Sequence, residues 1–171
     1  APPDIAGMVG QYAHGNEPSH HVAYLYAYAG QHYKTQARVR MLCQTMYRDE
    51  PDGLAGNEDC GQMSAWYVLS ALGLYAVDPV SANYVIGSPL FDRAELALGE
   101  GRSLLIEARN NAPDRPYIQS VRWNGRPYSR TWLRHADLAA GGHLVFEMGA
   151  APNKAYGAAL ADAPPSFEAL T

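Results

Sequence analysis

The sequence predicts an α+β fold in which helices come first and a block of strands follows. Apolar and aromatic runs with helical spacing fill the first part of the chain, whereas the second part carries short alternating runs separated by Gly, Pro and Asn. The pattern changes after Asp78 and Pro79, so we expect helices in residues 1–77 and a connector in residues 78–92. Residues 93–171 are then expected to form a small antiparallel β-sheet or sandwich unit with a C-terminal tail.

Three helices are expected in the first unit. The segment 18–30 opens with a proline and closes on a glycine, and its apolar and tyrosine side chains predict a helix that is buried nearly all round. Residues 34–48 carry one apolar stripe, which predicts an amphipathic helix. Residues 61–72 predict a third helix with little polar surface. Three such helices cannot bury one another, so we expect partner helices outside this sequence.

Four strands are expected in the second unit. The alternating runs that predict them are residues 94–99, 103–109, 117–125 and 143–149, and Gly, Pro and Asn residues lie between the runs. The last dozen residues lack this pattern. We therefore expect a loose tail after the strands.

The composition excludes several classes of protein. A hydrophobic content of 47% over 171 residues indicates a soluble globular protein, and a net charge of -4 with scattered arginines makes nucleic acid an unexpected partner. No apolar run reaches the roughly 18 residues of a membrane span. The start has neither an initiator Met nor a signal sequence, so we expect a piece of a longer chain. Cys43 and Cys60 are expected to be buried free thiols, with a single disulfide as the alternative.

The stretch HGNEPSHH, residues 14–21, contains the first candidate site residues. Glu17 precedes a helix-starting proline, in a slot where Asn, Asp or Ser is the usual cap. Glu17 and at least one of His20 and His21 could therefore face the same space at the start of the helix. The alternative is that the histidines are structural and that Glu17 only suits the positive end of the helix dipole. The order of residues does not match the H-E-x-x-H arrangement of zinc proteases, so zinc is not expected.

The stretch PDGLAGNEDCGQMSAWY contains the second candidate. Asp59 and Gln62 have the spacing of a capping box, so Asp59 could serve to bind the first amides of the following helix. A carboxylate fixed in this way is also held ionised, which suits a general base. Asn57 could point the same way and orient a water or a sugar hydroxyl, with Glu58 pointing elsewhere. Trp66 offers a flat face for a sugar, although aromatic residues at helical spacing usually belong to the core.

Long segments of the chain resemble one known family. GNEPSHHVAYLYAYAGQ, PDGLAGNEDCGQMSAWYVLSALGLY and YVIGSPLF, in this order, resemble the C-terminal part of glycoside hydrolase family 92, the calcium-dependent exo-α-mannosidases. PYIQSVRWNGRPY and GGHLVFEMGAAPNKAYG resemble the end of the same proteins. The resemblance implies that residues 1–77 are the terminal helices of an (α/α)6 catalytic barrel. An N-terminal β-sandwich and the remaining barrel helices would lie upstream in the same polypeptide.

The resemblance also implies roles for individual residues. The expected reaction is inverting hydrolysis of terminal α-linked mannose from N-glycan-type or mannan substrates, with α1,2 as the expected linkage. Asp59 matches the family's general base. Asn57 stands where many members have a second, assisting acid, and an amide cannot share a proton. Glu17 matches the glutamate beside the calcium ion and the terminal mannose, and His20 is close enough to be a further contact with the sugar.

Further expectations concern the ion, the acid and the location. Calcium prefers hard oxygen ligands, so Glu17 is a better ligand than either histidine. The ion is expected to bind two mannose hydroxyls and to help distort the ring. The general acid is expected upstream, so the 171-residue chain alone is expected to be inactive, and the family implies a secreted or periplasmic bacterial enzyme. The alternative is a non-catalytic carbohydrate-binding or structural module in which Glu17 and Asp59 only cap helices.

Overall fold

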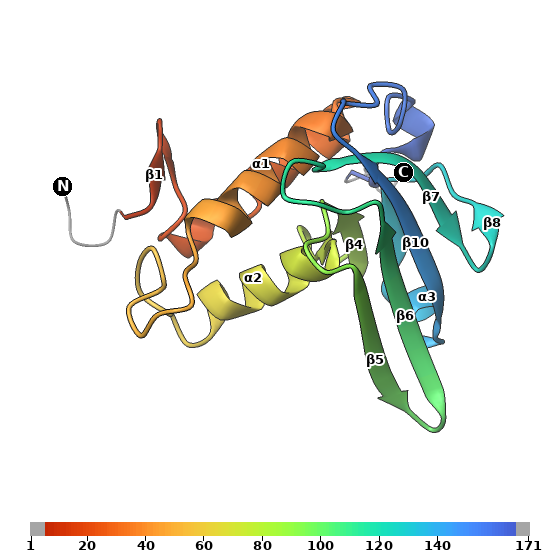
Figure 1. The fold of residues 1–171 in the computed structure, drawn as a ribbon, viewed down its shortest axis with the longest axis horizontal. Helices are drawn as coiled ribbons and strands as arrows, with labels where there is room; N and C mark the ends of the chain where they lie inside the picture. The colour runs from red at the N-terminus through yellow and green to blue at the C-terminus, as the bar shows by residue number, and fades with distance from the viewer. Residues whose placement is uncertain (1–5, 167–171) are drawn as a thin grey trace, which may run out of the picture.

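The first half of the chain forms helical segments and one small hairpin. A computed structural model describes residues 6–166 and places these segments beside a large sheet (Figure 1). In chain order they are β1 (Met8–Val9), β2 (Tyr12–Ala13), the 3₁₀ helices η1 (Glu17–Ser19) and η2 (Val22–Ala29), α1 (His32–Thr45) and α2 (Gln62–Leu72). Helices are therefore present in all three segments where the sequence predicts them.

The first predicted helix differs from the expectation in kind and in burial. It consists of two 3₁₀ segments, η1 and η2, joined by a turn, and η2 ends at Gly30, whose φ of 67° is the left-handed value that glycine tolerates best. Tyr24 is fully buried, but Val22 and Leu25 are 40% and 45% exposed. The prediction of burial nearly all round was therefore wrong for the described residues. The exposed side of η2 lacks the partner that its apolar side chains require.

Helix α1 buries two faces instead of the one that was predicted. The predicted apolar stripe is present, since Val39, Leu42 and Cys43 are at most 3% exposed. A second face is polar and also buried: His32, Gln36 and Arg40 lie four residues apart on it, with 0%, 0% and 3% exposure. A sequence pattern based on hydrophobicity assigns such residues to the solvent, so it could not reveal this face.

The polar face of α1 is tied to the strands by hydrogen bonds. The Ile118 N–H donates to Gln36 Oε1 (2.7 Å), Gln36 Nε2 donates to His32 Nδ1 (2.7 Å), and His32 Nε2 donates to the Ile86 carbonyl (2.7 Å). Arg40 donates to four further oxygens, on Ser88, Pro89, Asn111 and Ala112. Buried polar groups are costly unless they are paired, and here every partner outside α1 belongs to the second half of the chain.

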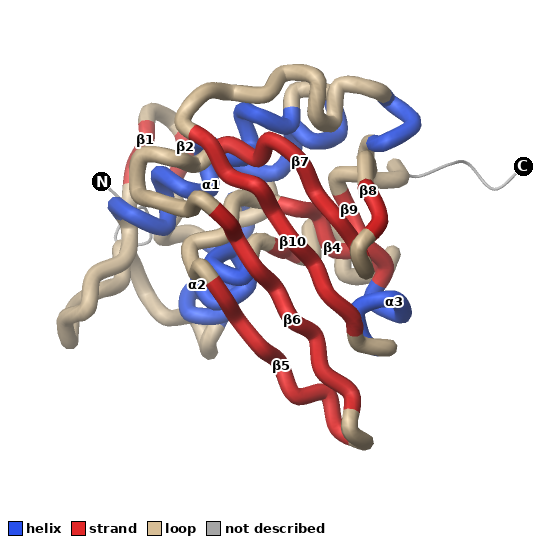
Figure 2. The backbone as a smooth tube through the Cα atoms, turned by 45° about the vertical axis from the view of Figure 1, so that its right-hand side comes forward, coloured by secondary structure: helices blue, strands red, loops and turns tan. Residues whose placement is uncertain are grey.

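The second half of the chain forms two sheets and short helical turns (Figure 2). The smaller sheet has the antiparallel order β3 (Leu74–Tyr75), β4 (Asn83–Ile86), β9 (Trp132–Arg134). The larger sheet has the order β5 (Arg93–Gly99), β6 (Arg102–Arg109), β10 (Gly142–Gly149), β7 (Tyr117–Trp123), β8 (Arg126–Pro127). The remaining elements are α3 (His135–Ala139) and η3 (Leu160–Asp162).

All four predicted strands are present, but their pairing is not purely antiparallel. β10 lies between β6 and β7, antiparallel to β7 and parallel to β6, with Leu144 opposite Ile106. The expectation of an antiparallel unit is therefore corrected to a mixed sheet. Alternation within a strand reports which residues face the core and says nothing of strand direction, so the sequence could not show this.

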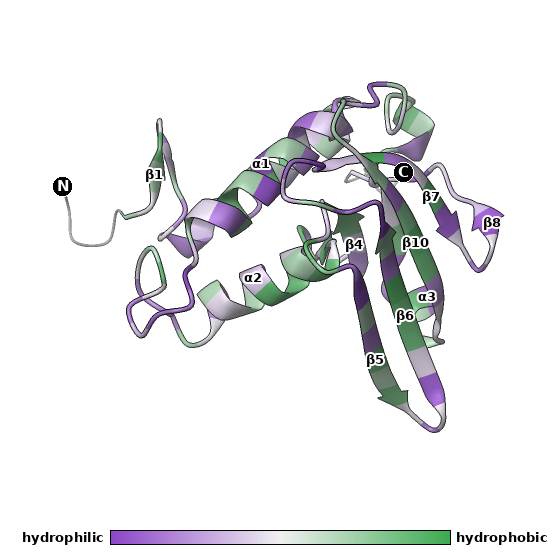
Figure 3. Cartoon of the chain, viewed as in Figure 1, coloured by the Kyte–Doolittle hydropathy of each residue, from purple (hydrophilic) through white to green (hydrophobic). Residues whose placement is uncertain are grey.

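The predicted connector, residues 78–92, takes part in both cores. It contains β4, in which Val85 packs with the helices while its neighbour Ile86 packs with the sheet. Figure 3 shows hydrophobic residues running along β6 and β10, which form the centre of the sheet core, and mixed character along α1. The helical part and the strand part therefore share a continuous interface through β4 and α1.

Two smaller expectations also change. The described part of the tail is anchored, since Asp162 accepts hydrogen bonds from the Thr131 N–H (2.9 Å) and from Ser129 Oγ (2.7 Å); residues 167–171 of the predicted tail lie outside the described residues. Both cysteines are free, but only Cys43 is buried and Cys60 is exposed. Among residues 6–166, we find no helix with the length and apolarity that crossing a membrane requires.

The two buried hydrogen bonds of the Gln36 side chain predict that replacing this residue lowers the stability of the protein. Gln36→Ala leaves the Ile118 N–H and His32 Nδ1 without partners, and each buried unsatisfied group costs about 1–3 kcal/mol. We expect a clearly lower melting temperature for this variant of the full-length protein in a thermal unfolding experiment. Gln44→Ala, at an exposed position of the same helix, is the matched control and should leave the melting temperature nearly unchanged. Equal melting temperatures for the two variants would contradict this account.

Candidate active site

Two loops that are distant in sequence cross beside the N-termini of η2 and α2. At the crossing, a Cβ atom added to Gly56 would lie 2.7 Å from Gly15 Cα, and one added to Gly15 would lie 2.6 Å from the Ala55 carbonyl oxygen. Both distances are too short for any side chain, so the crossing requires glycine at both positions. The first loop leads into Glu17 and the second into Asp59. The glycine-rich turn before the polar residues 57–59 therefore has a structural reason.

His20 joins these two loops. Its Nε2 donates to the His14 carbonyl (2.9 Å), and its Nδ1 accepts a hydrogen bond from Gln62 Nε2 (3.0 Å). The Trp66 indole N–H donates to the His20 carbonyl (3.0 Å). Burial lowers the pKa of His20, while its bond to the His14 backbone and the charges of Glu17 and Asp59 oppose that shift. His20 is 1% exposed, and both of its ring nitrogens have partners within the protein.

An open pocket of ≈ 400 Å³ lies against this junction. Glu17, His20 and His21 line one side of it, and Gln62 and Tyr75 line another. The Glu17 side chain is exposed, so its carboxylate is accessible to solvent and to a ligand. The structure therefore brings Glu17 and His20 to one pocket, as the sequence predicts.

Asp59 is exposed and is not among the residues that line the pocket; the backbone N–H of Gln62, which does line it, donates to the Asp59 carbonyl (3.2 Å). Asp59, Cys60 and Gly61 have successive φ values of 53°, 56° and 96°, so three consecutive residues adopt the left-handed conformation. Asp tolerates this conformation better than most residues, although it still costs energy relative to the right-handed form. The backbone is thus held in an unfavourable turn just where the candidate base stands.

The capping role predicted for Asp59 belongs to a different residue. The N-cap of α2 is Gly61, without a side-chain cap hydrogen bond, and Gln62 reaches His20 instead of completing a capping box. Glu58 binds the first turn: its carboxylate accepts from the Ser64 N–H (3.0 Å) and from Ser64 Oγ (2.7 Å). These two bonds hold the pKa of Glu58 below its usual value. Glu58 therefore points away from the pocket, as expected.

Asn57 is exposed in the same loop and is not among the residues that line the pocket. Its predicted role beside Asp59 has no geometric support among the described contacts. Glu17 was predicted in the cap position but is the first residue of η1, whose N-cap is Asn16.

Comparison with known proteins identifies the family. The model of the glycosyl hydrolase family 92 catalytic domain matches residues 1–150. The chain belongs to glycosyl hydrolase family 92. Within it, a family 92 alpha-mannosidase of Bacteroides thetaiotaomicron, solved in complex with mannoimidazole, is 40% identical with a TM-score of 0.93 over 96% of this chain and 22% of that one.

Two further relatives support the same placement in family 92. An inverting mannosidase of Bacteroides thetaiotaomicron is 46% identical with a TM-score of 0.87, over 92% of this chain and 21% of that one. A protein described as an uncharacterized secreted glycosidase of Arthroderma benhamiae is 29% identical over 91% of this chain and 20% of its own length. The family 92 chain thus spans about one fifth of the length of these relatives.

The resemblance implies a calcium ion. The side chains of the described residues show whether this family 92 chain could hold such an ion by itself. Within residues 6–166, no group of three or more His, Cys, Asp or Glu side chains is placed to hold a metal ion. Glu17 offers one accessible carboxylate, whereas calcium takes 6–8 oxygen ligands. Both ring nitrogens of His20 are already occupied. The described residues alone therefore do not fit a complete calcium site.

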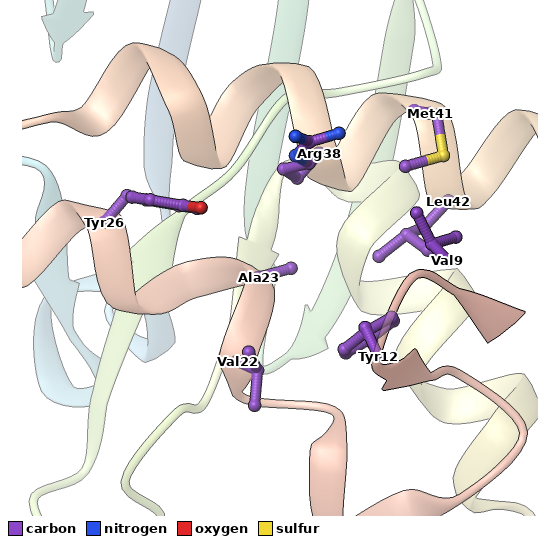
Figure 4. A pocket seen from close by; sticks show the side chains of 8 residues that line it. All are labelled: Val9, Tyr12, Val22, Ala23, Tyr26, Arg38, Met41 and Leu42. Carbon is purple, nitrogen blue, oxygen red and sulfur yellow. The ribbon is translucent and has the colours of Figure 1, made fainter.

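A second pocket, of ≈ 200 Å³, lies between the β1–β2 hairpin, η2 and α1 (Figure 4). Its walls are mostly apolar, and Arg38 is the charged residue that points into this region of the family 92 chain. Glycoside hydrolysis requires a pair of carboxylates, and none lines this pocket. The Glu17 pocket is the candidate active site, since Glu17 is an accessible carboxylate in its lining.

The sequence interpretation missed three residues that lie in or beside the candidate site. Gln62 was assigned to a capping box, Tyr75 was not considered, and His14 was only part of a quoted motif. His14 is fully buried; its Nδ1 is 2.8 Å from the Tyr12 hydroxyl and its Nε2 is 2.8 Å from the Tyr47 hydroxyl. The sequence shows polar residues close to apolar runs. It does not show which of these polar residues form hydrogen bonds with one another.

The buried histidines predict how stability depends on pH. Burial lowers the pKa of His14 to about 3 and that of His32 to about 4, whereas both titrate near 6.5 when unfolded. The unfolded chain therefore binds protons first, so their contribution to stability is complete above pH ~6.5 and is lost on acidification, by up to about 1.4 kcal/mol per pH unit for each imidazole. The melting temperature should fall steeply between pH 6.5 and 4.5.

Thermal unfolding of the full-length protein at several pH values checks this expectation. His21→Gln, at an exposed position, is the control and should leave the slope of melting temperature against pH unchanged. A flat profile between pH 7.5 and 4.5 would show that these imidazoles are not buried in the neutral form.

Proposed function

We propose that this chain forms the general-base side of the active site of an inverting exo-α-mannosidase. The substrate is terminal α-linked mannose, with a preference for α1,2 linkages, on N-glycan-type or mannan chains. Family membership and the mannosidase relatives support the reaction class. The observation that carries the proposal is that Glu17 lines an open pocket with the buried His20, and that Gln62, in the same lining, is hydrogen-bonded both to His20 and to the backbone of Asp59.

Asp59 is the proposed general base, which takes a proton from the attacking water. Of the two neighbouring acids, Glu58 is engaged by Ser64, which leaves Asp59 as the carboxylate on the His20 side. A carboxylate in this position must stay ionised to act as a base. The general acid is a glutamate in the part of the polypeptide upstream of this chain. An inverting enzyme holds its two carboxyl groups roughly 6.5–9.5 Å apart, so that a water fits between them.

Glu17 is the proposed contact with the terminal mannose and with calcium. It is exposed at the pocket and negatively charged, which suits both a sugar hydroxyl and a hard cation. When bound, the ion would supply a positive charge that holds sugar hydroxyls in place. Its other ligands must come from outside the described residues, and the roles proposed here for Asp59 and Glu17 do not depend on a step at the ion.

The chain is proposed to be the terminal part of a longer, secreted or periplasmic enzyme. It spans about one fifth of the relatives, one of which is described as secreted. Val22, Leu25 and Val68 on η2 and α2 are 40–52% exposed, which is unusual for helices with so little polar surface. The remaining helices of an (α/α)6 barrel would cover them, and an N-terminal β-sandwich would complete the pocket.

Asp59→Asn separates the catalytic role from a structural one. Asn tolerates the left-handed conformation as Asp does, so the melting temperature of the full-length protein should hardly change. Loss of the base should lower kcat for release of mannose from an α-mannoside by a factor of about 10² or more. Glu58→Gln is the matched control, since its side chain serves α2, and it should retain nearly full turnover. Near-normal turnover of Asp59→Asn would end the assignment.

Glu17→Gln tests the binding role. The substitution removes a formal charge at the pocket and preserves the shape of the side chain, so calcium and substrate should both bind about tenfold more weakly, as expected for losing one charged contact. Isothermal titration of the full-length protein with calcium, and with mannose in the presence of calcium, measures both affinities. Glu50→Gln, an exposed acid outside the pocket, is the control. Unchanged affinities would show that Glu17 is only part of the turn before η2.

A further inference from the structure

We propose that His20 and Gln62 are a positioning pair that sets the separation of Glu17 and Asp59. The inference rests on the proposed function for the roles of these two acids. It assigns to His20 a task different from the sugar contact that the resemblance implies. It also gives Gln62, which the sequence interpretation treated as part of a helix cap, a direct connection to the site.

An unbroken path of short bonds runs from one acid to the other. The backbone N–H of His20 donates to the Glu17 carbonyl (3.0 Å), so the main chain of His20 is fixed to the main chain of the first acid. The backbone N–H of Gln62 donates to the Asp59 carbonyl (3.2 Å), which fixes the main chain of Gln62 to the main chain of the second acid. The bond from Gln62 Nε2 to His20 Nδ1 (3.0 Å) closes the path. This side-chain hydrogen bond therefore joins the two halves of the site, beside the bond from the Trp66 indole to the His20 carbonyl.

The donor and acceptor atoms of the bond between Gln62 and His20 determine the tautomer of His20. Gln62 Nε2 can only donate, so His20 Nδ1 must be the acceptor and the ring proton must be on Nε2, where it meets the His14 carbonyl. This requires a neutral imidazole, in agreement with a pKa that burial lowers. With both nitrogens engaged, His20 has no free donor or acceptor for a sugar hydroxyl or a cation. Its function at the pocket is to hold other groups in place.

The surrounding contacts make the pair rigid. Gln62 Nε2 also lies 3.2 Å from the Tyr75 hydroxyl, which steadies the amide from the β3 side. The Trp66 indole holds the His20 carbonyl, and the His14 ring lies beside the His20 ring with centroids 4.9 Å apart. Catalysis is sensitive to such placement, because a displacement of about 1 Å can cost a factor of about 10² in rate.

Two substitutions break the same bond from opposite ends. Gln62→Met keeps the length of the side chain and removes the donor. His20→Gln preserves an amide that can donate to the His14 carbonyl and removes the acceptor at Nδ1. In the full-length enzyme, each should lower kcat about 10- to 100-fold, with KM changed less than about threefold, because the acids are misplaced but retained. The double variant should be no worse than the poorer single variant, because both changes remove one interaction.

Control variants and alternative outcomes make the result decisive. Gln44→Met, at an exposed position of α1, should behave like the parent. The proposal is overturned if Gln62→Met retains the parent kcat, or if the two losses multiply in the double variant. A His20→Gln enzyme with raised KM and normal kcat would instead make His20 a direct contact with the sugar. If Gln62→Met does not fold, Gln62→Glu serves in its place, since a carboxylate of the same length also lacks the donor.

A second measurement separates this inference from the proposed function. Crystal structures of the full-length parent and of Gln62→Met give the distance between the Glu17 and Asp59 carboxylates whatever reaction the enzyme catalyses. We expect a different distance, or loss of a single defined position for one acid, in the variant. An unchanged distance would overturn the positioning role. A changed distance in a protein that does not release mannose would uphold the positioning role and reject the proposed reaction.

Discussion

The buried polar face of α1 is the constraint on which the rest of the structure depends. His32, Gln36 and Arg40 cannot be left without partners in the interior, and all of their partners except one another lie in residues 86–118. The helical part and the sheets must therefore dock in one arrangement, since hydrogen bonds have directions that apolar contacts lack. The apolar stripe of α1, on its other face, then fixes η2 and the aromatic cluster around Trp66. The geometry of the pocket follows from these two faces.

The active site uses the same principle on a smaller scale. Its two loops can approach only because Gly15 and Gly56 have no side chains, and the approach brings polar groups into the interior. His14 and His20 satisfy those groups in the neutral form, so no charge is buried there without compensation. The two acids, Glu17 and Asp59, are exposed at the solvent side. The buried histidines thus position the loops of the site, whereas the exposed acids are the residues that can contact a substrate.

The sequence predicted the structure where a single pattern determined an element or a site. Apolar periodicity located α1, α2 and the four long strands, and long motifs pointed to the family and to Glu17 and Asp59. The sequence predicted less where the same pattern is compatible with two structures. The polar face of α1 resembles a solvent face until its partners are known, and the direction of β10 leaves no trace in its alternation. The capping-box spacing of Asp59 and Gln62 did not reveal that the Gln62 side chain binds His20 and that Glu58 binds the first turn of α2. Pairing between distant polar groups is a property of three dimensions, and a single sequence does not encode it in any local pattern.

The position of β10 in the large sheet has a consequence for how the protein is made. Its central strand is the last of the sheet to leave the ribosome, because β6 and β7 are complete at Arg109 and Trp123 while β10 ends at Gly149. At roughly 5–20 residues per second, the nascent chain carries two unpaired strand edges for a few seconds before they are bridged. A message truncated before the codon for Gly142 would yield a polypeptide with the helices of the pocket but without β10, the strand that joins β6 to β7. In this truncated product, the edges of β6 and β7 that β10 normally covers would be exposed to the quality-control factors that act on nascent chains.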